Sequence, residues 1–204
     1  SQREILQLTW PLALGAGATL CAVDRGRSVD TTMGFTPLEG LVMATRSGTV
    51  DPGLLLWLEE HVGMPPSELA STLEHRSGLL GLTGTADMRS ILQAERDGDQ
   101  AAQAAVEVYL HRLRSAIAAM AAAMDGLDGL VFTGGVGEGS SAIRARAAER
   151  LRFLGVRLDT EANDALEPDA DIGAAGAAVR AFVIRAREDL AIARQVRTVL
   201  GEDP

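Results

Sequence analysis

The stretch that decides the fold is VDTTMGFTPLEGLVMATRSG, residues 29–48. It mixes glycines, threonines and a proline with two acids, Asp30 and Glu39, and one base, Arg46. Such a stretch is too polar for a strand core and too broken for a long helix. Loops of this kind, held by a rigid scaffold, often carry binding and catalytic groups, although an ordinary surface connection can have the same composition.

The whole chain has the composition of a globular protein with one good-sized domain or two small ones. It has 204 residues, of which 47% are hydrophobic and 23% charged. A net charge of −9 argues against non-specific binding to nucleic acid and against docking on anionic lipid. The single cysteine, Cys21, excludes an intrachain disulfide and fits a reducing compartment. No apolar run reaches transmembrane length and the N-terminus does not read as a signal peptide, so we expect a cytoplasmic protein.

Before residue 29 the sequence predicts antiparallel strands. Residues 5–14 are apolar enough for a buried strand, but Pro11 argues against a central position in a sheet. Residues 18–23 read as a second strand and residues 27–32 as a third. Between them lies a hairpin turn in which Gly26 can take a positive φ.

After residue 48 the sequence predicts a run of helices. Asp51 is expected as the N-cap of the first helix, with Pro52 at its first position. Its apolar stripe would be Leu54, Leu55, Leu58 and Val62. A second helix is expected from the Pro-Pro-Ser at 65–67 through residue 75, capped by Ser67. Residues 77–85 read as a glycine-punctuated loop. Two further helices are expected over residues 86–96 and 99–124.

The last third of the chain alternates strands and helices. Residues 129–133 form a short apolar strand that runs into a glycine turn at 134–138 and then a helix at about 141–154. That order suits a phosphate or nucleotide site. Further strands are expected at 156–158 and 180–185 and a last helix at 188–200, whereas residues 161–176 receive no assignment. The pattern predicts an α/β protein with a mixed sheet.

The central stretch also carries a family resemblance. DTTMGFTPLEG at 30–40, TRSG at 45–48 and DP at 51–52 closely resemble the signature of the acetate kinase family, within the acetate and sugar kinase, heat-shock and actin superfamily. The resemblance implies a ribonuclease H-like (actin-like ATPase) domain, with flanking helices and a helical insertion at about 51–125. It covers nearly all of this chain, but only the C-terminal half of the family enzyme. Residues 1–204 would be its C-terminal nucleotide-binding domain, without the N-terminal sister domain.

The first candidate ATP-binding segment is Ala13-Leu14-Gly15-Ala16-Gly17. Its glycines let the backbone approach a phosphate closely, although many such turns are purely structural. The family has His-Leu-Gly-Asn-Gly here, at the ATP phosphates. This chain keeps both glycines and replaces the imidazole and the amide by alanine, which removes two side-chain donors.

The second candidate segment is Gly135-Val136-Gly137-Glu138-Gly139. It resembles the family's adenosine-side loop, Gly-Ile-Gly-Glu-Asn, with glycine in place of the asparagine.

The third candidate segment is Asp87-Met88-Arg89, which matches residues that border adenine and ribose in the family. Without the resemblance, Asp87 and Arg89 read as the solvated charges of a helix N-terminus.

Arg46 is the candidate catalytic residue. A guanidinium suits the charge on a transferring phosphoryl group, and the resemblance implies that the arginine of Thr-Arg-Ser-Gly stabilises the transition state. By itself, a loop arginine is more often a solvated charge. Glu188 is the candidate metal ligand, because the resemblance places a Mg²⁺-holding glutamate there. A carboxylate at a helix start is usually a cap or dipole partner, and one acid is not a metal site on its own.

The resemblance implies phosphorylation of acetate by ATP, with Mg²⁺, to give acetyl phosphate. The family's acetate-binding arginine and catalytic aspartate lie in the missing half, so we expect little chemistry from the chain alone. Two alternatives stay open: a non-catalytic nucleotide-binding or dimerisation module, and a propionate or butyrate kinase. The expected partners are ATP or ADP and, in the complete enzyme, acetate or acetyl phosphate. No nucleic acid or membrane partner is expected, and the family's pairing through this domain predicts a homodimer.

Overall fold

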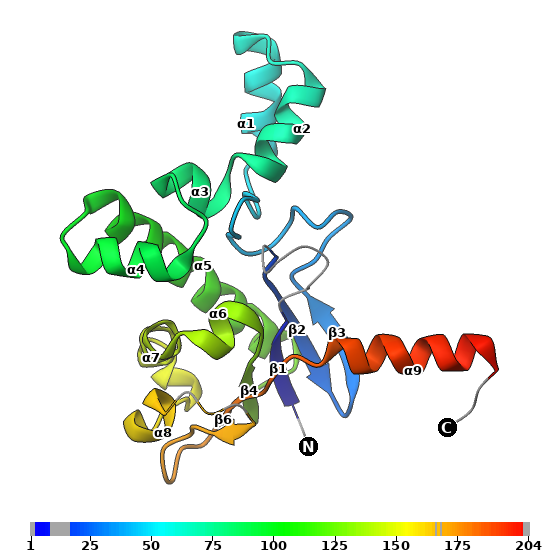
Figure 1. The fold of residues 1–204 in the computed structure, drawn as a ribbon, viewed down its shortest axis with the longest axis vertical. Helices are drawn as coiled ribbons and strands as arrows, with labels where there is room; N and C mark the ends of the chain where they lie inside the picture. The colour runs from blue at the N-terminus through cyan, green and yellow to red at the C-terminus, as the bar shows by residue number, and fades with distance from the viewer. Residues whose placement is uncertain (1–2, 9–16, 166, 168, 202–204) are drawn as a thin grey trace.

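A six-stranded mixed sheet lies at the centre of the protein (Figure 1). The computed structural model describes residues 3–8, 17–165, 167 and 169–201. The strands run in the order β3-β2-β1-β4-β6-β5. Their bounds are β1 (Arg3–Leu8), β2 (Thr19–Asp24), β3 (Arg27–Thr31), β4 (Gly129–Phe132), β5 (Ala170–Asp171) and β6 (Arg180–Val183). β1, β4 and β6 are parallel, β2 is antiparallel to both β1 and β3, and β5 is antiparallel to β6. The predicted mixed sheet is therefore present.

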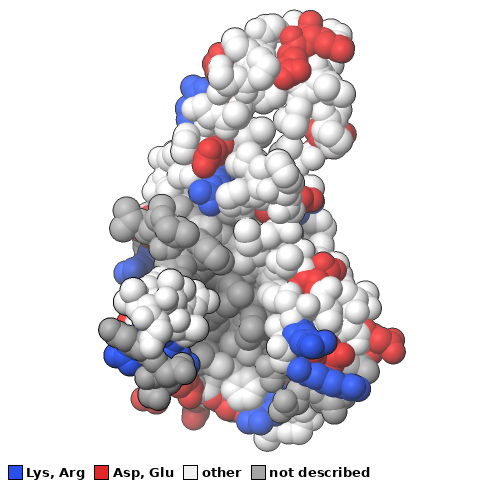
Figure 2. Space-filling view, turned by 90° about the vertical axis from the view of Figure 1, so that its right-hand side faces the viewer, with Lys and Arg blue, Asp and Glu red and all other residues white. Residues whose placement is uncertain are grey.

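Six helical segments lie between β3 and β4. They are α1 (Pro52–Trp57), the π-helix η1 (Leu58–Val62), α2 (Pro66–His75), α3 (Gly78–Thr83), α4 (Met88–Arg96) and α5 (Gln100–Ala123). α1 and α2 project away from the sheet (Figure 1). Figure 2 shows acidic side chains gathered at the tip of this projection, and the exposed Glu59 and Glu60 lie in η1.

The remaining helices follow β4 and β6. α6 (Gly134–Gly139), α7 (Ser141–Glu149), the 3-10 helix η2 (Arg152–Leu154) and α8 (Thr160–Asp164) come before β5, and α9 (Glu188–Leu200) follows β6. α9 extends to one side of the sheet, beyond β3 in the view of Figure 1. No helix in the described ranges is long and apolar enough to cross a membrane.

The core lies between α5 and one face of the sheet. α5 begins at the N-cap Asp99, whose carboxylate accepts a hydrogen bond from the Ala102 amide at 2.7 Å. Its buried stripe follows helical spacing: Val106, Tyr109, Leu110, Leu113, Ile117 and Met120. The same core cluster includes the inward-facing strand residues Leu20, Ala22, Leu130 and Phe132. The long predicted helix and the apolar strand predicted after it are thus both confirmed, and both contribute side chains to this core.

The predicted hairpin is confirmed at Arg25 and Gly26, which both take positive φ angles, 51° and 78°. Two such residues form the tight turn whose twist matches paired strands. The expected marginal position of the first strand is wrong. The strand ends at Leu8 and lies between β2 and β4, whereas Pro11 lies outside the described residues.

Several helix predictions need correction. The expected loop at 77–85 is wrong, because residues 78–83 form α3. The expected cap at Ser67 is wrong as well, since α2 begins at Pro66 and its N-cap is Pro65. The first helix does begin at the N-cap Asp51, but Leu54 and Val62 of its expected apolar stripe are exposed.

The segments after β4 also differ from the prediction. The expected glycine turn at 134–138 is wrong, because α6 occupies it. The helix expected to reach residue 154 ends at Glu149 and is followed by η2. The strand expected at 156–158 is reduced to isolated bridges at Val156 and Leu158. The unassigned stretch at 161–176 contains most of α8 and all of β5.

Candidate functional site

The candidate site lies at one edge of the sheet, where four strands end. β3 is parallel to β1, because both are antiparallel to β2, and β4 and β6 are parallel to β1. The segments that follow these strands therefore leave the sheet at the same edge. In open α/β sheets ligands bind outside the carboxyl ends of the strands. Of the first glycine segment, Ala13, Leu14, Gly15 and Ala16 lie outside the described residues. Gly17 is half-buried just before β2.

Helix α6 contains the second glycine segment and begins directly after β4. Gly134 has a φ of +75°, which turns the chain from the strand into the helix. Gly137 packs inward, where an added Cβ would lie 3.4 Å from the Phe132 backbone. Gly135 and Gly139 are exposed, with open space where a Cβ would stand. Val136 is half-buried between them. α6 therefore leaves an outer face made of bare backbone.

The Glu138 side chain binds the N-terminal end of α6. Its Oε1 accepts hydrogen bonds from the backbone amides of Gly134 at 2.7 Å and Ala186 at 2.9 Å. The Thr133 hydroxyl lies 3.5 Å from the same oxygen as a third donor. One carboxylate oxygen thus joins the end of β4 to the segment between β6 and α9. Sequence reasoning placed Glu138 at the nucleotide, and the structure gives it this connecting role.

A second residue, Arg144 of α7, binds the C-terminal carbonyls of α6. Sequence reasoning missed this residue. Its side chain is completely buried. Nη1 donates to the carbonyls of Gly137 and Glu138, both at 2.8 Å, while Nε and Nη2 donate to the Oδ1 and the carbonyl of Asn163 at 2.8 and 2.7 Å. Burial lowers the pKa of Arg144, and the nearby Asp164 carboxylate acts in the opposite direction.

The loop that carries Arg46 follows β3 and is fixed by α3. The carbonyls of Met43, Ala44 and Thr45 accept from the amides of Leu79, Leu80 and Ser77, each at 2.9 Å. Arg46 itself is about a quarter exposed, and its Nη2 lies 3.7 Å from Oε1 of Glu74. The loop therefore has a defined backbone, and the guanidinium keeps access to solvent.

The Asp87-Met88-Arg89 segment begins α4. Asp87 is the N-cap, and its carboxylate accepts from the hydroxyl and amide of Ser90 and from the Arg89 amide. These bonds, led by the one from the Ser90 hydroxyl, lower the pKa of Asp87. Met88 is buried against the core, and Arg89 is exposed. The structure thus gives Asp87 a capping role and Met88 a packing role.

Glu188 is the first residue of α9. The link before it is tied back to Asp169, whose carboxylate pairs with the Arg187 guanidinium and accepts from the Arg185 amide at 3.2 Å. Arg187 is the main cause that lowers the pKa of Asp169. Among the residues that the structure describes, no three or more His, Cys, Asp or Glu side chains form a cluster that could hold a metal.

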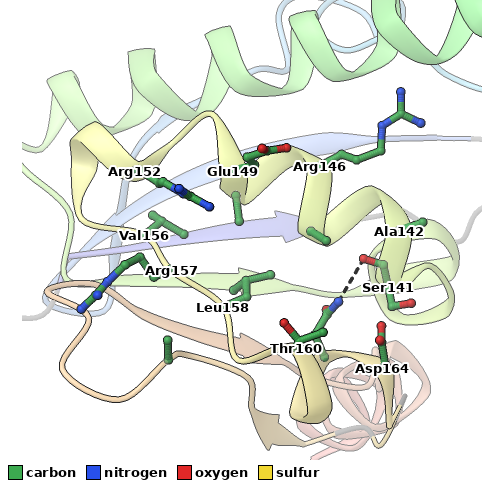
Figure 3. A pocket seen from close by; sticks show the side chains of 14 residues that line it. Ser141, Ala142, Arg146, Glu149, Arg152, Val156, Arg157, Leu158, Thr160 and Asp164 are labelled. Atoms are coloured by element: carbon green, nitrogen blue, oxygen red, sulfur yellow. Dashed lines mark hydrogen bonds between the residues drawn. The ribbon is translucent and has the colours of Figure 1, made fainter.

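Two cavities lie beside these elements, and none of the predicted nucleotide residues that the structure describes lines either one. A cavity of about 550 Å³ lies between α7, η2 and α8 (Figure 3). Glu149 and Arg152 line it on one side and Thr160 and Asp164 on the other, and the Asn163 amide group donates to the Ser141 carbonyl at 3.1 Å. A second cavity, about 490 Å³, lies between the loop after β3 and α5.

Comparisons with known proteins point to one family. The model of the Acetokinase family matches residues 6–194. The acetate kinase of Synechocystis sp. is 47% identical over 182 residues, which are 89% of this chain and 44% of the relative. The acetate kinase of Gloeobacter violaceus is 50% identical over 183 residues, 89% of this chain and 45% of the relative. The chain thus spans less than half the length of these curated relatives.

Solved structures agree on the fold. The crystal structure of Porphyromonas gingivalis acetate kinase matches with a TM-score of 0.89 and 35% identity, over 98% of this chain and 49% of that one. A propionate kinase from Francisella tularensis matches with a TM-score of 0.85 and 36% identity, over 94% and 48%. The predicted actin-like ATPase fold, with a mixed sheet and flanking helices, is confirmed.

Proposed function

The chain belongs to the acetokinase family, and from this premise we propose that it is the nucleotide-binding, C-terminal half of an acetate kinase. The complete enzyme would transfer the γ-phosphoryl group of ATP to acetate, giving acetyl phosphate and ADP. One observation carries the proposal. The Arg46 loop after β3 and the glycine helix α6 after β4 leave the same edge of the sheet.

The residues at this edge of the sheet would have separate roles in nucleotide binding and phosphoryl transfer. The exposed backbone of α6 would border the nucleotide, with Gly17 near the phosphates and Asp87 and Arg89 near the base. Arg46 would meet the phosphoryl group as negative charge spreads over its oxygens, because its planar donors match that charge. Phosphoryl transfer depends mainly on such positioning and charge stabilisation.

Magnesium would enter with the nucleotide. Mg²⁺ usually keeps several waters and binds through one or two carboxylates and the substrate phosphates. A carboxylate at Glu188 would therefore be a partial site that ATP completes. Bound there, the ion would neutralise phosphate charge.

The test compares the chain alone with the complete protein. We expect the purified chain to bind Mg-ADP and to show negligible acetyl phosphate formation in a hydroxamate assay, because half a cleft lacks the acetate side. Adding back the N-terminal half should restore turnover. Turnover by the chain alone near the usual enzyme range, roughly 1–1000 per second, would contradict the half-site argument. Nucleotide binding that never leads to turnover in the complete protein would favour a non-catalytic module.

The acyl acceptor needs its own measurement. The similarity to a propionate kinase, at 36% identity and a TM-score of 0.85, supports propionate as a second candidate substrate. Rates with acetate, propionate and butyrate, measured on the complete protein, would separate these acceptors.

The proposal includes a homodimer. Phe35 is fully exposed in the loop after β3, and Met33 is also exposed. Large apolar side chains grouped on a surface favour contact with another protein. Light scattering should give a mass above the 21.4 kDa of one chain. A monomer at high concentration would contradict this part of the proposal.

A further inference from the structure

Helix α6 cannot hold its own shape. It has six residues, GGVGEG, and four of them are glycine. Glycine is less favourable inside a helix than any other residue except proline. A helix of this length also lacks enough internal hydrogen bonds to offset the cost of nucleation. The surrounding structure must therefore impose the shape of α6, and the residues that do so control the backbone face that α6 exposes.

Arg144 supplies this support from behind. The last carbonyls of a helix have no partner within the helix, and the Arg144 Nη1 group donates to two of them, those of Gly137 and Glu138. The other side of the guanidinium is anchored on Asn163 of α8, through both its side-chain oxygen and its carbonyl. Four hydrogen bonds thus connect α6, α7 and α8 through one side chain.

The chemistry of this position argues for more than core filling. Burying a guanidinium costs several kcal/mol, and well-packed apolar residues often serve a core as well or better. None of the four hydrogen bonds goes to a carboxylate. What a rigid fork of donors adds, and an apolar side chain cannot, is a fixed placement of the carbonyls that it contacts.

From this geometry we infer that Arg144 is a positioning residue for the nucleotide segment. It holds α6 through the Gly137 and Glu138 carbonyls, with Asn163 as the anchor, and thereby fixes the outer face of Gly135 and Gly139. The role in binding rests on the proposed function, whereas the clamp itself does not. Arg144 acts through α6 and is not assigned a contact with the nucleotide.

The experiment compares three variants of the full chain. Arg144→Met removes all four hydrogen bonds, and Arg144→Lys keeps a donor that can reach part of the set. Arg146→Met is the matched control. Arg146 lies on the same helix, and the change removes the same charge and strong bonds, to Glu95 at 2.8 Å and Glu107 at 2.9 Å, without touching α6. Readouts are hydrogen exchange of the amides at 138–140 relative to those of β4, and the Kd for Mg-ADP well below the melting temperature.

We expect Arg144→Met to speed exchange in α6 by about tenfold or more while the β4 amides stay protected, since local opening then needs less free energy. The Kd for Mg-ADP should rise by about tenfold. Arg144→Lys should give values between those of Arg144→Met and the unmodified chain, and Arg146→Met should change neither readout.

If the role of Arg144 were only structural, Arg144→Met would lower the melting temperature and leave the Kd of the folded protein unchanged. Unchanged α6 exchange in both Arg144 variants would overturn the clamp. If Arg144→Met does not fold, Arg144→Lys and Asn163→Ala decide it by the same exchange readout. If the unmodified chain binds no nucleotide, the proposed function fails, and exchange still decides the clamp.

Discussion

Gly78 is a position where a single methyl group should dislodge the Arg46 loop. Its φ is +60°, and an added Cβ would lie 2.3 Å from the Met43 carbonyl oxygen and 2.6 Å from that of Arg46. Both distances are far inside van der Waals contact, and both neighbours are backbone. In Gly78→Ala either α3 or the loop must therefore move.

The expected cost follows from two contributions. A non-glycine residue in the left-handed region costs about 1–2 kcal/mol. Moving α3 away from the loop also weakens the three hydrogen bonds that the amides at 77, 79 and 80 donate to the loop, each worth about 1 kcal/mol. If all three bonds are lost, the sum is about 4–5 kcal/mol in the free energy of unfolding, a large part of the stability of a typical domain.

Gly84 provides the control within the same helix. It is the C-cap of α3 with a φ of +77°, and nothing lies within 4 Å of its added Cβ. Gly84→Ala should therefore lose only the left-handed term, about 1–2 kcal/mol. Urea denaturation followed by circular dichroism, with linear extrapolation, measures both variants. Equal losses for Gly78→Ala and Gly84→Ala would refute the claim that the loop is held against α3 by close backbone contact.

Three further predictions concern single side chains. In the complete enzyme, Arg46→Ala should lower kcat on the order of 10³-fold with little change in the KM for ATP and in Tm, and Lys should rescue poorly; a stable variant with normal kcat removes Arg46 from catalysis. Glu138→Gln should preserve exchange protection of the two amides that this side chain binds, since an acceptor oxygen remains, and Glu138→Ala should lose it; equal loss in both would mean that charge, and not the hydrogen bonds, matters. Arg187→Gln should raise the Asp169 pKa, measured by NMR titration, because Arg187 lowers it in the folded chain. A lowered folded pKa means that the Asp169 contribution to stability is complete above its unfolded pKa of about 3.9 and is lost as pH falls through the folded value; an Asp169 pKa that ignores Arg187 would show that the pair does not form in solution.

Local signals were enough to predict much of this fold. Asp51 was identified as an N-cap because an aspartate before a proline satisfies the first free amides of a helix, and its carboxylate does accept from the Gly53 amide. The hairpin at Gly26 and the stripe of α5 follow from turn chemistry and helical period, which are properties of a few neighbouring residues.

The errors occur where distant partners decide the structure. Glycine spacing made residues 77–85 and 134–138 look like loops. Both contain helices, because α3 donates its first amides to the Arg46 loop and α6 is held by Glu138 and Arg144. Helix propensity is a weak preference that such tertiary bonds override.

Arg144 left a signal that single-residue reasoning passed over. It shares a face of α7 with Ala147 and Ala148, three and four residues later, and both are buried. An arginine in register with an apolar stripe points into the core, where it must find partners for its donors. Its neighbour Arg146 lies off this stripe and is partly exposed. The helical spacing of the apolar residues could therefore have distinguished the buried Arg144 from the partly exposed Arg146. It could not have identified the hydrogen-bond partners of Arg144.

Two carboxylates from other parts of the chain, those of Glu138 and Asp169, bind the segment before α9. Glu138 binds the amides of Gly134 and Ala186, so it fixes both the N-terminal end of α6 and the segment that leads into α9. Asp169 binds only the approach to α9, through Arg185 and Arg187. Loss of Asp169 should therefore loosen α9 alone, whereas loss of Glu138 should loosen α9 and α6 at once.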